Sequence, residues 1–543
     1  MRRFSGAGAG RGPIGRPHAR TLGPVGAALA FLAALPLMLL AMLLGMVALA
    51  ATLVLARGGR GGVRAWRFGG PAPGVPGAGA GASADASRPE ADASEPKPGA
   101  SEPAADAADP AAERRRGKSY AEIVEAWPLV LAASLLAGAF APGTALARLL
   151  VPMDDAQTNH LKAYGLAFWV LEQGQKAEWL LNYRGGSFLL ADDAATEREA
   201  NIRGVTLEPV GGSAEAAIRA EIADENMESV ALEKAPKVAV YIPPNTPPWD
   251  DAVTLALQYA DIPYARVWDE EVLKGDLAKY DWLHLHHEDF TGQHGKFWAA
   301  YHSMPWYVEE EAVQKAMAAK LGFAKVSRLK GAVALAIRDY VARGGFMFGM
   351  CSATDTYDIA LASAGVDIAD VVYDGDPPDP ASQAKLDFSQ TLAFRDFRLE
   401  PDPIAYRFSD IDVTADANQR GPETFFTLFA FSAKNDPVPT MLTQDHVNAV
   451  AEFLGQSTGF RRSKLKPGVV ALGEVEGTDE VKYLHGQFGR GTYTFLGGHD
   501  PEDYQHMVGD PETKLDQFPH SPGYRLILNN VLFPAAEKKK QKT

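Results

Sequence analysis

The chain is poor in cysteine and in positive charge. Cys351 is the single cysteine among 543 residues, so no intrachain disulfide can form. A lone cysteine is either a small buried apolar residue or a reactive thiol. The formal net charge is −15, and the sequence shows no basic stripe that could neutralise phosphates. We therefore expect no nucleic acid partner.

The chain begins with an apolar segment, which is followed by a segment of biased amino-acid composition. Residues 26–56 form a charge-free run longer than the roughly 20 residues that a membrane-spanning helix needs. We therefore expect residues 1–68 to hold a basic segment and a transmembrane helix that anchors the protein in a membrane. Residues 69–118 consist mainly of Ala, Gly, Pro, Ser, Asp and Glu, which predicts a disordered linker.

Residues 119–147 have the features of a secretory signal peptide. A basic cluster at 113–118 precedes a short apolar run at 127–141, and Ala145-Leu-Ala147 fits a cleavage site. This interpretation predicts a cell-envelope protein whose soluble part is exported or membrane-anchored outside the cytoplasm. The alternative is a second membrane helix, in which case a two-helix anchor leaves the soluble part facing the cytoplasm.

Strands and helices alternate through the remainder of the chain. The pattern predicts an N-terminal α/β subdomain at 148–235, a larger domain at 236–534 and a basic tail at 535–543. Alternation of this kind predicts a doubly wound, mostly parallel sheet with helices on both faces. In such sheets ligands bind at the carboxyl ends of the strands, and we expect the functional residues there.

Cys351 directly follows an apolar strand at 344–350 and precedes a predicted helix, so we place it at this edge of the sheet. His499 follows a later apolar strand that ends in two glycines. A thiol becomes a nucleophile when a histidine lowers its pKa and a carboxylate orients that histidine. Either Glu502 or Asp500 could supply this carboxylate.

The densest group of polar side chains lies at 284–295, after another predicted strand. His286, His287 and Glu288 fit substrate binding, a structural role, or a transition-metal site, since imidazole suits zinc and nickel. Neighbouring residues of a strand point to opposite faces, which disfavours a tight metal site built from the two histidines together. The leading interpretation therefore contains no metal and no cofactor.

Several stretches resemble the class I glutamine amidotransferase-like fold, in which a Cys-His-Glu triad hydrolyses glutamine. The resemblance rests on the order of elements, the strand-Cys-helix turn and the late Gly-Gly-His with a nearby Glu. Over 148–543 the chain also resembles bacterial envelope proteins that are often labelled asparagine synthetase B. The stretches that carry this second resemblance are 151–165, 182–187, 284–295, 351–355, 497–506 and 521–534.

The resemblance implies a flavodoxin-like sheet and a cysteine-dependent amide hydrolase acting on a small-molecule or peptide-like amide. It further implies oxyanion-hole amides near Gly292 or Gly295. We expect substrate binding by His286, His287, Glu288, Gly292, Gly295, Ser352, Asp355 and Asp500. Ala353 stands where the amidotransferase turn has its second glycine, and the Ser-Gly-Gly-x-Asp-Ser-type ATP loop of asparagine synthetases is missing.

Two other functions are compatible with the sequence. One is a non-catalytic envelope module that binds a ligand or serves as a scaffold. The other is a metal-dependent hydrolase centred on His286, His287 and Glu288.

Overall fold

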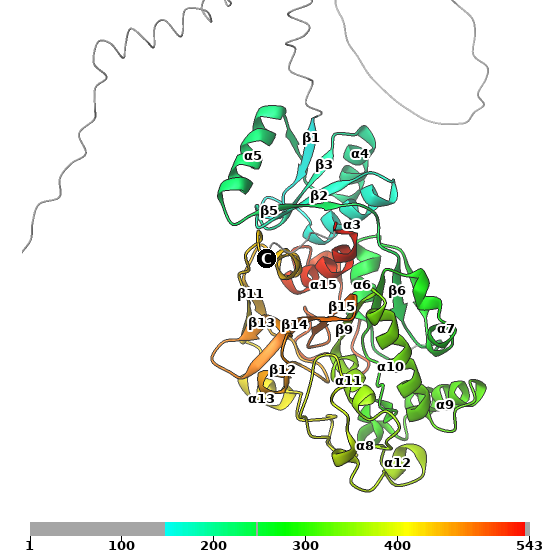
Figure 1. Ribbon diagram of the computed structural model, residues 1–543. Coiled ribbons are helices and arrows are strands. Elements are labelled where there is room, and N and C mark those ends of the chain that lie inside the picture. Colours follow the sequence, from blue (N-terminus) through cyan, green and yellow to red (C-terminus); the bar gives the residue numbers. More distant parts are fainter. Residues whose placement is uncertain (1–146, 246–247, 538–543) are drawn as a thin grey trace, which may run out of the picture. The chain divides into compact units, whose positions relative to one another are not determined.

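The computed structural model describes residues 147–245 and 248–537 (Figure 1). The predicted transmembrane segment, the linker, the signal-like segment up to residue 146 and the tail from residue 538 lie outside these residues. Among the helices that are described, none combines the length and the apolar character that a membrane crossing requires.

The N-terminal part forms a five-stranded sheet in the order β4-β1-β3-β2-β5, and all its pairings are antiparallel. Its strands are β1 (Arg148–Val151), β2 (Ala177–Leu181), β3 (Ser187–Ala191), β4 (Glu208–Val210) and β5 (Glu228–Leu232). Because side chains alternate along a strand, Leu149 and Val151 pack on one face and Leu150 on the other. Helix α3 (His160–Glu172) covers the first face and α5 (Gly212–Asp224) the second.

The larger sheet has ten strands in the order β11-β10-β13-β14-β15-β9-β8-β6-β7, with β12 paired to β14. Strands β15, β9, β8, β6 and β7 run parallel, and the remaining pairings are antiparallel. The strands are β6 (Val238–Tyr241), β7 (Tyr264–Val267), β8 (Trp282–Leu285), β9 (Phe346–Met350), β10 (Phe425–Leu428), β11 (Ala449–Ala451), β12 (Phe460–Arg461), β13 (Val470–Val475), β14 (Glu480–Phe488) and β15 (Gly491–Leu496).

The prediction of a doubly wound, mostly parallel, flavodoxin-like sheet is wrong. Half of the large sheet joins through antiparallel pairings, and the smaller sheet is antiparallel throughout. The physical reason lies in the connections. Only Gly489 and Arg490 separate β14 from β15, whereas a parallel crossover needs a dozen or more residues.

Two apolar layers sandwich the parallel half of the large sheet. Alternate residues such as Ala239, Leu283 and Met347 pack under α10 (Val326–Ala342) and α11 (Asp355–Ala362). Their neighbours in sequence pack on the opposite face, toward α6 (Ala252–Tyr259) and α15 (Pro522–Leu532). Strands buried on both faces read as continuous apolar runs, as the sequence of β9 does.

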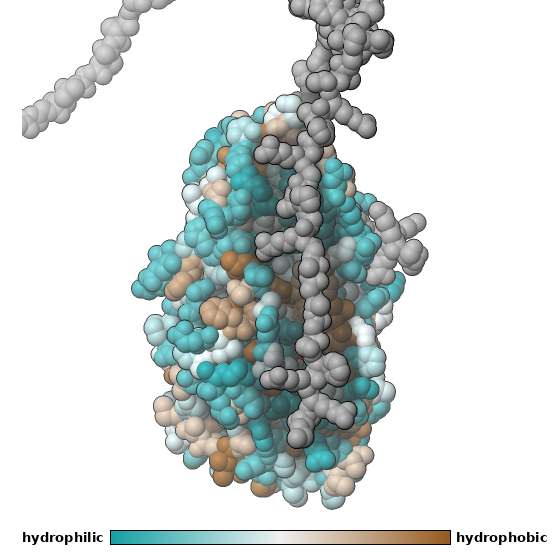
Figure 2. All heavy atoms as spheres, turned by 90° about the vertical axis from the view of Figure 1, so that its left-hand side faces the viewer, coloured by the Kyte–Doolittle hydropathy of each residue, from teal (hydrophilic) through white to brown (hydrophobic). Residues whose placement is uncertain are grey.

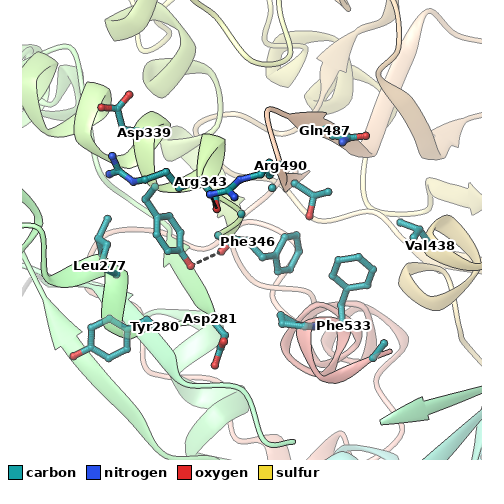
Figure 3. A pocket seen from close by; sticks show the side chains of 18 of the residues that line it. Leu277, Tyr280, Asp281, Asp339, Arg343, Phe346, Val438, Gln487, Arg490 and Phe533 are labelled. Carbon is teal, nitrogen blue, oxygen red and sulfur yellow. Dashed lines mark hydrogen bonds between the residues drawn. The ribbon is translucent and has the colours of Figure 1, made fainter. Parts of the chain in front are cut away.

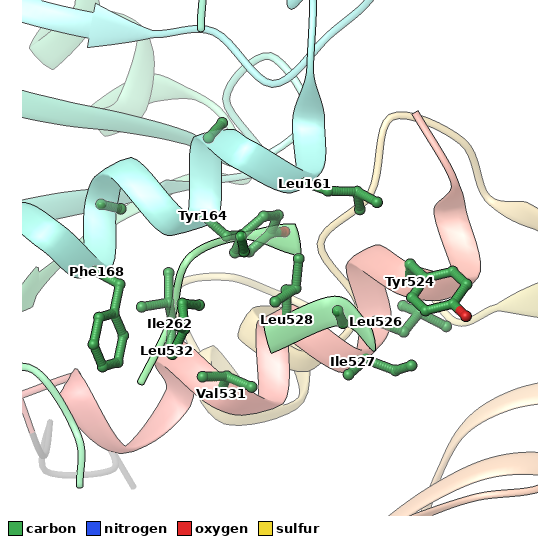
Figure 4. Close-up of a cluster of buried hydrophobic side chains, with 14 of the residues drawn as sticks. Leu161, Tyr164, Phe168, Ile262, Tyr524, Leu526, Ile527, Leu528, Val531 and Leu532 are labelled. Atoms are coloured by element: carbon green, nitrogen blue, oxygen red, sulfur yellow. The ribbon is translucent and has the colours of Figure 1, made fainter. Parts of the chain in front are cut away.

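Helix α15 is the central helix of the described part and lies between the two sheets. Its side chains pack against α3 of the smaller sheet and α6 of the larger one, where Tyr164, Phe168 and Leu528 meet (Figure 4). The helix begins at Ser521, whose hydroxyl accepts a hydrogen bond from the Tyr524 amide, as expected for an N-cap. The packing of α15 therefore joins the two sheets through one apolar core.

Shorter elements complete the structure. The helices are α4 (Ala194–Arg203), α7 (Asp269–Leu273), α8 (Trp298–Tyr301), α9 (Pro305–Lys320), α12 (Val371–Asp374), α13 (Thr414–Arg420) and α14 (Pro437–Leu442). Single 3-10 turns are η2 (Asp276–Lys279), η3 (His294–Lys296), η4 (Cys351–Ala353), η5 (Ser382–Lys385), η6 (Arg462–Lys464), η7 (Leu515–Gln517) and η8 (Phe533–Ala535). On the face shown in Figure 2, hydrophilic residues predominate, with hydrophobic residues between them.

Candidate active site

The site lies where four parallel strands end. Strands β6, β8, β9 and β15 run in the same direction, so their carboxyl ends meet at one edge of the sheet. His286 follows β8, Cys351 follows β9, and His499 lies three residues after β15. The loop after β6 supplies Asp250.

Cys351 occupies a sharp turn between β9 and the short η4 that leads into α11. Its φ of 50° lies in the left-handed region, which is unusual for a residue other than glycine. A hydrogen bond to the segment after β8 stabilises this turn: the Ala353 N–H donates to the His286 carbonyl over 2.9 Å. Backbone strain of this kind costs about 1–3 kcal/mol and clusters at functional sites.

His499 reaches the cysteine from the end of β15. Two glycines make this approach possible: a Cβ on Gly497 would lie 2.2 Å from the Thr458 carbonyl oxygen, and Gly498 has a φ of 95°. The His499 side chain contacts Cys351, and its Nε2 lies 3.8 Å from Oδ1 of Asp250. Burial alone would lower the pKa of His499, but Asp250 and Cys351 more than offset it and raise the pKa to about 9.

Asp250 is the carboxylate that faces this histidine. Its Oδ1 also lies 2.9 Å from Nε2 of His506, and its side chain is 3% exposed. Burial would raise the pKa of Asp250, but His499 and His506 together hold it far below its usual range. The aspartate therefore carries a negative charge at the centre of a group of imidazoles.

The two carboxylates expected beside His499 lie elsewhere. The Glu502 amide donates to Oδ1 of Asp500 over 2.9 Å, and the Glu502 side chain contacts Ser521. Burial raises the pKa of Glu502. Asp500 is fully buried and contacts Tyr524. Within the described residues, His499 forms its ion pair with Asp250 rather than with either of them.

The structure stacks four histidines at the site. The rings of His286 and His287 lie 3.9 Å apart, His287 lies 4.5 Å from His499, and His499 stacks on His506 at 4.4 Å. Burial lowers the pKa of His286 to about 4, despite the nearby charge of Asp251. Burial also lowers the pKa of His287 strongly. Both rings are therefore neutral at pH 7.

Glu288 belongs to a different group of side chains. Its carboxylate pairs with the fully buried Lys330, which also lies 3.1 Å from Asp269. Tyr241 donates a hydrogen bond to the same aspartate. Burial raises the pKa of Glu288 to about 7. The expected trio of His286, His287 and Glu288 is thus divided, because the two histidines approach His499 and the glutamate approaches Lys330.

The loop expected to supply oxyanion-hole donors is organised around Asp289. This carboxylate accepts hydrogen bonds from the amides of Gln293 and Gly295 at 2.8 and 3.0 Å, so the Gly295 amide is already engaged. Gly292 packs tightly, since a Cβ there would lie 2.6 Å from the Ser327 backbone.

A different amide faces the thiol. The Gln456 N–H donates to the sulfur of Cys351 over 3.4 Å, and the Gln456 side chain donates to the Gly295 carbonyl over 2.6 Å. Ser352 lines the cleft beside the cysteine. Asp355 lies beneath it, where it accepts a hydrogen bond from Ser457, and burial and the charge of Asp412 raise its pKa to about 8.

Cys351 opens onto a cleft of about 350 Å³. His499, His506 and Gln456 line it together with the cysteine, and aromatic side chains supply much of the remaining wall. The aromatic residues are Trp249, Phe297, Tyr301 and Tyr406. A second pocket of about 280 Å³ shares Trp249, His287 and Phe297 with this cleft.

A larger pocket, of about 880 Å³, lies at the opposite ends of the strands, beside the starts of β8, β9 and β15 (Figure 3). Arg343 and Arg490 border it, and Tyr340 donates a hydrogen bond to the Phe346 carbonyl over 3.3 Å. It contains none of the residues that surround Cys351.

Sequence reasoning missed three residues at this site. Asp250 follows a proline-rich turn that gives no sign of its contacts, and Gln456 lies in a loop without a recognisable motif. His506 was visible, seven residues after His499, but nothing in this spacing indicates that the two rings stack.

Comparison with known proteins does not assign the chain to a family. No family model matches it, and no curated protein matches it either. Two cytoplasmic proteins from Salmonella typhimurium are similar to it in structure at 11% and 12% identity, with TM-scores of 0.28 and 0.26. The matches cover 56% and 55% of this chain and 100% and 99% of those proteins.

An exo-β-1,4-mannosidase from Opitutaceae bacterium strain TAV5 is similar at 12% identity with a TM-score of 0.19, over 48% of this chain and 31% of that protein. TM-scores this low define no shared fold. The chemistry of the site must therefore be inferred from its own residues.

Proposed function

We propose that this protein is a cysteine-dependent amide hydrolase. Cys351 is the nucleophile, His499 exchanges protons with the reacting groups, and Asp250 orients His499 and stabilises its charged form. The observation that carries the proposal is the contact between His499 and Cys351, made at a strained turn that opens onto a cleft. A positively charged imidazole beside a thiol stabilises the thiolate, which is the reactive form.

The proposed reaction proceeds in two steps, acylation of Cys351 and hydrolysis of the thioester. The Cys351 thiolate attacks the amide carbonyl carbon, and His499 donates its proton to the leaving amine as the C–N bond breaks. Water then attacks the resulting thioester and gives a proton to His499, and the C–S bond breaks to release the acid. The Gln456 N–H, which already donates to the sulfur, serves as a donor to the oxyanion of both tetrahedral intermediates.

The cleft and the resemblance of the sequence motifs support the proposed class of substrate. Aromatic walls around a volume of about 350 Å³ suit a small-molecule or peptide-like amide. The amidotransferase-like motifs make the side-chain amide of glutamine the first substrate to test. The N-terminal apolar segments support a location in the cell envelope, with the hydrolase anchored or exported outside the cytoplasm.

Release of ammonia from a panel of primary amides, starting with glutamine, tests this proposal. We expect turnover by the wild type and a loss of at least a hundredfold in Cys351→Ala, because no other thiol can replace the nucleophile. Mass spectrometry of the quenched reaction should show an acyl group on Cys351. Turnover that persists in Cys351→Ala contradicts the proposal.

A non-catalytic ligand-binding module is the competing function. It predicts that amides of the panel bind to the cleft and protect Cys351 from alkylation, while neither ammonia nor a thioester appears. Equal binding by wild type and Cys351→Ala, without turnover by either, would favour this alternative.

A further inference from the structure

Asp250, His499 and His506 bring three potential metal ligands together. One carboxylate oxygen and two imidazole nitrogens lie within 4.8 Å of one another. Oδ1 of Asp250 is 2.9 Å from Nε2 of His506 and 3.8 Å from Nε2 of His499. Two ligands of a tetrahedral zinc ion are about 3.3 Å apart when the bonds measure about 2.0 Å, so this spacing needs little adjustment.

These facing atoms are buried, and their polar neighbours are one another. The side chains of Asp250, His499 and His506 are 3%, 8% and 2% exposed. Apart from these ion pairs, both carboxylate oxygens of Asp250 and the Nε2 atoms of the two histidines have no hydrogen-bond partner within the part of the chain that is described. Buried polar atoms without partners are costly and call for an explanation. A single cation at their centre would satisfy all of them.

His506 is oriented as a metal ligand. Its Nδ1 donates to Oδ2 of Asp503 over 3.0 Å, and its Nε2 lies 2.9 Å from Oδ1 of Asp250. A carboxylate that accepts from the far nitrogen of a histidine is the usual second partner of metal-bound imidazole. Two lone-pair atoms 2.9 Å apart also repel each other unless a proton or a metal ion lies between them.

A second group of imidazoles shares His499 with the first. Nitrogens of His286 and His287 lie within 4.8 Å of one from His499. His287 donates from Nε2 to the Asp250 carbonyl over 2.7 Å, so its Nδ1 remains available as a ligand. A donor set of imidazoles and one carboxylate is typical of zinc and related transition metals.

We propose that Asp250, His499 and His506 bind one divalent transition-metal ion, with zinc as the ion that best suits these ligands. We further propose, on the basis of the proposed thiol chemistry, that metal binding and catalysis exclude each other. An imidazole that binds a metal through Nε2 carries its proton on Nδ1 and has no lone pair left. His499 can therefore either serve Cys351 or bind the metal, and zinc reversibly inhibits the hydrolase.

Calorimetric titration of metal-free, full-length protein with zinc chloride tests the site. We expect one equivalent to bind to the wild type and to Cys351→Ala, so this result does not depend on the proposed catalysis. Asp250→Asn and His506→Ala should bind at least tenfold more weakly. The surface variant His302→Ala is the control, because His302 is exposed and its ring hydrogen-bonds to the Trp298 carbonyl and stacks on the Trp298 ring.

A milder variant keeps the test valid if those substitutions disturb folding. Asp503 is 34% exposed, and Asp503→Asn should weaken zinc binding 10- to 100-fold through His506 alone. No stoichiometric zinc binding by the wild type, or equal affinity in all variants, overturns the site.

Alkylation of Cys351 tests the exclusion separately. One equivalent of zinc should slow iodoacetamide labelling at least tenfold in the wild type and leave labelling of His506→Ala unchanged. Zinc that binds without slowing the reaction, or that accelerates amide hydrolysis, overturns the exclusion.

Discussion

At the scale of single residues, the proposed chemistry depends on the charge of Asp250. Together with Cys351, this carboxylate offsets the burial of His499 and raises the pKa of that histidine to about 9. The folded protein therefore retains a proton that the unfolded chain, with an ordinary pKa of 6.5, loses at lower pH. The resulting stabilisation is fully present below pH 6.5 and disappears as the pH rises through 9.

We expect the free energy of unfolding to fall by roughly 3 kcal/mol between pH 6.5 and pH 9. In Asp250→Asn most of this decrease should vanish, because the neutral amide no longer favours the imidazolium. Urea unfolding of both proteins at the two pH values measures the difference. A decrease of equal size in both proteins would show that Asp250 does not set the pKa of His499.

Only part of the site could be predicted from the sequence. The sequence places Cys351 and His499 after strands, and strands that end at one edge bring such residues near each other. The third partner was not readable in this way. Sequence proximity favoured Glu502 and Asp500, whereas the ion pair comes from Asp250, almost 250 positions earlier in the chain. Only tertiary packing creates that contact.

At the scale of elements, the turn after β15 fixes where His499 lies. Gly498 has a φ of 95°, and a Cβ on it would lie 2.4 Å from the Phe453 ring. Gly477 offers a matched comparison, since its φ of 76° is also positive but nothing lies within 4 Å of the added atom. Both glycines therefore have a positive φ, but an added Cβ would clash with neighbouring atoms only at Gly498.

We expect Gly498→Ala to lower the free energy of unfolding by more than Gly477→Ala, which should cost only about 1 kcal/mol for its backbone conformation. Gly498→Ala should also slow Cys351 alkylation, because the displaced turn moves His499. Chemical denaturation and labelling of the two variants provide the measurement. Equal destabilisation with unchanged labelling would contradict a positioning role for this turn.

The predicted strand directions are wrong where short connections join consecutive strands of the large sheet. The alternation of strands and helices through β6, β7, β8 and β9 predicts their parallel order, and the structure has it. From β10 onward no helix of crossover length separates consecutive strands of this sheet, and hairpins follow. A one-residue or two-residue turn signal such as Gly489-Arg490 is weak in sequence, so β14 and its antiparallel pairing were missed.

At the scale of the whole molecule, the site exists only in the folded chain. Asp250, Cys351 and His499 come from three loops, and the parallel sheet alone places them at one edge. Helix α15 lies between the two sheets, so the smaller sheet and the site-bearing sheet share one core. The sequence predicted a single kind of sheet for both parts. It could not show that the smaller sheet is antiparallel, because local propensity fixes neither the order nor the direction of the strands in a sheet.

The rate of Cys351 alkylation by iodoacetamide at pH 6, in native and in urea-unfolded protein, tests the central claim most directly. The sequence holds one thiol, so all of the label reports on Cys351. An ordinary cysteine with a pKa near 8.5 is only about 0.3% thiolate at this pH. We predict at least tenfold faster labelling of the native protein than of the unfolded chain, and loss of this advantage in His499→Gln. Slower labelling of the native protein than of the unfolded chain would contradict the claim and identify Cys351 as a buried, inert thiol.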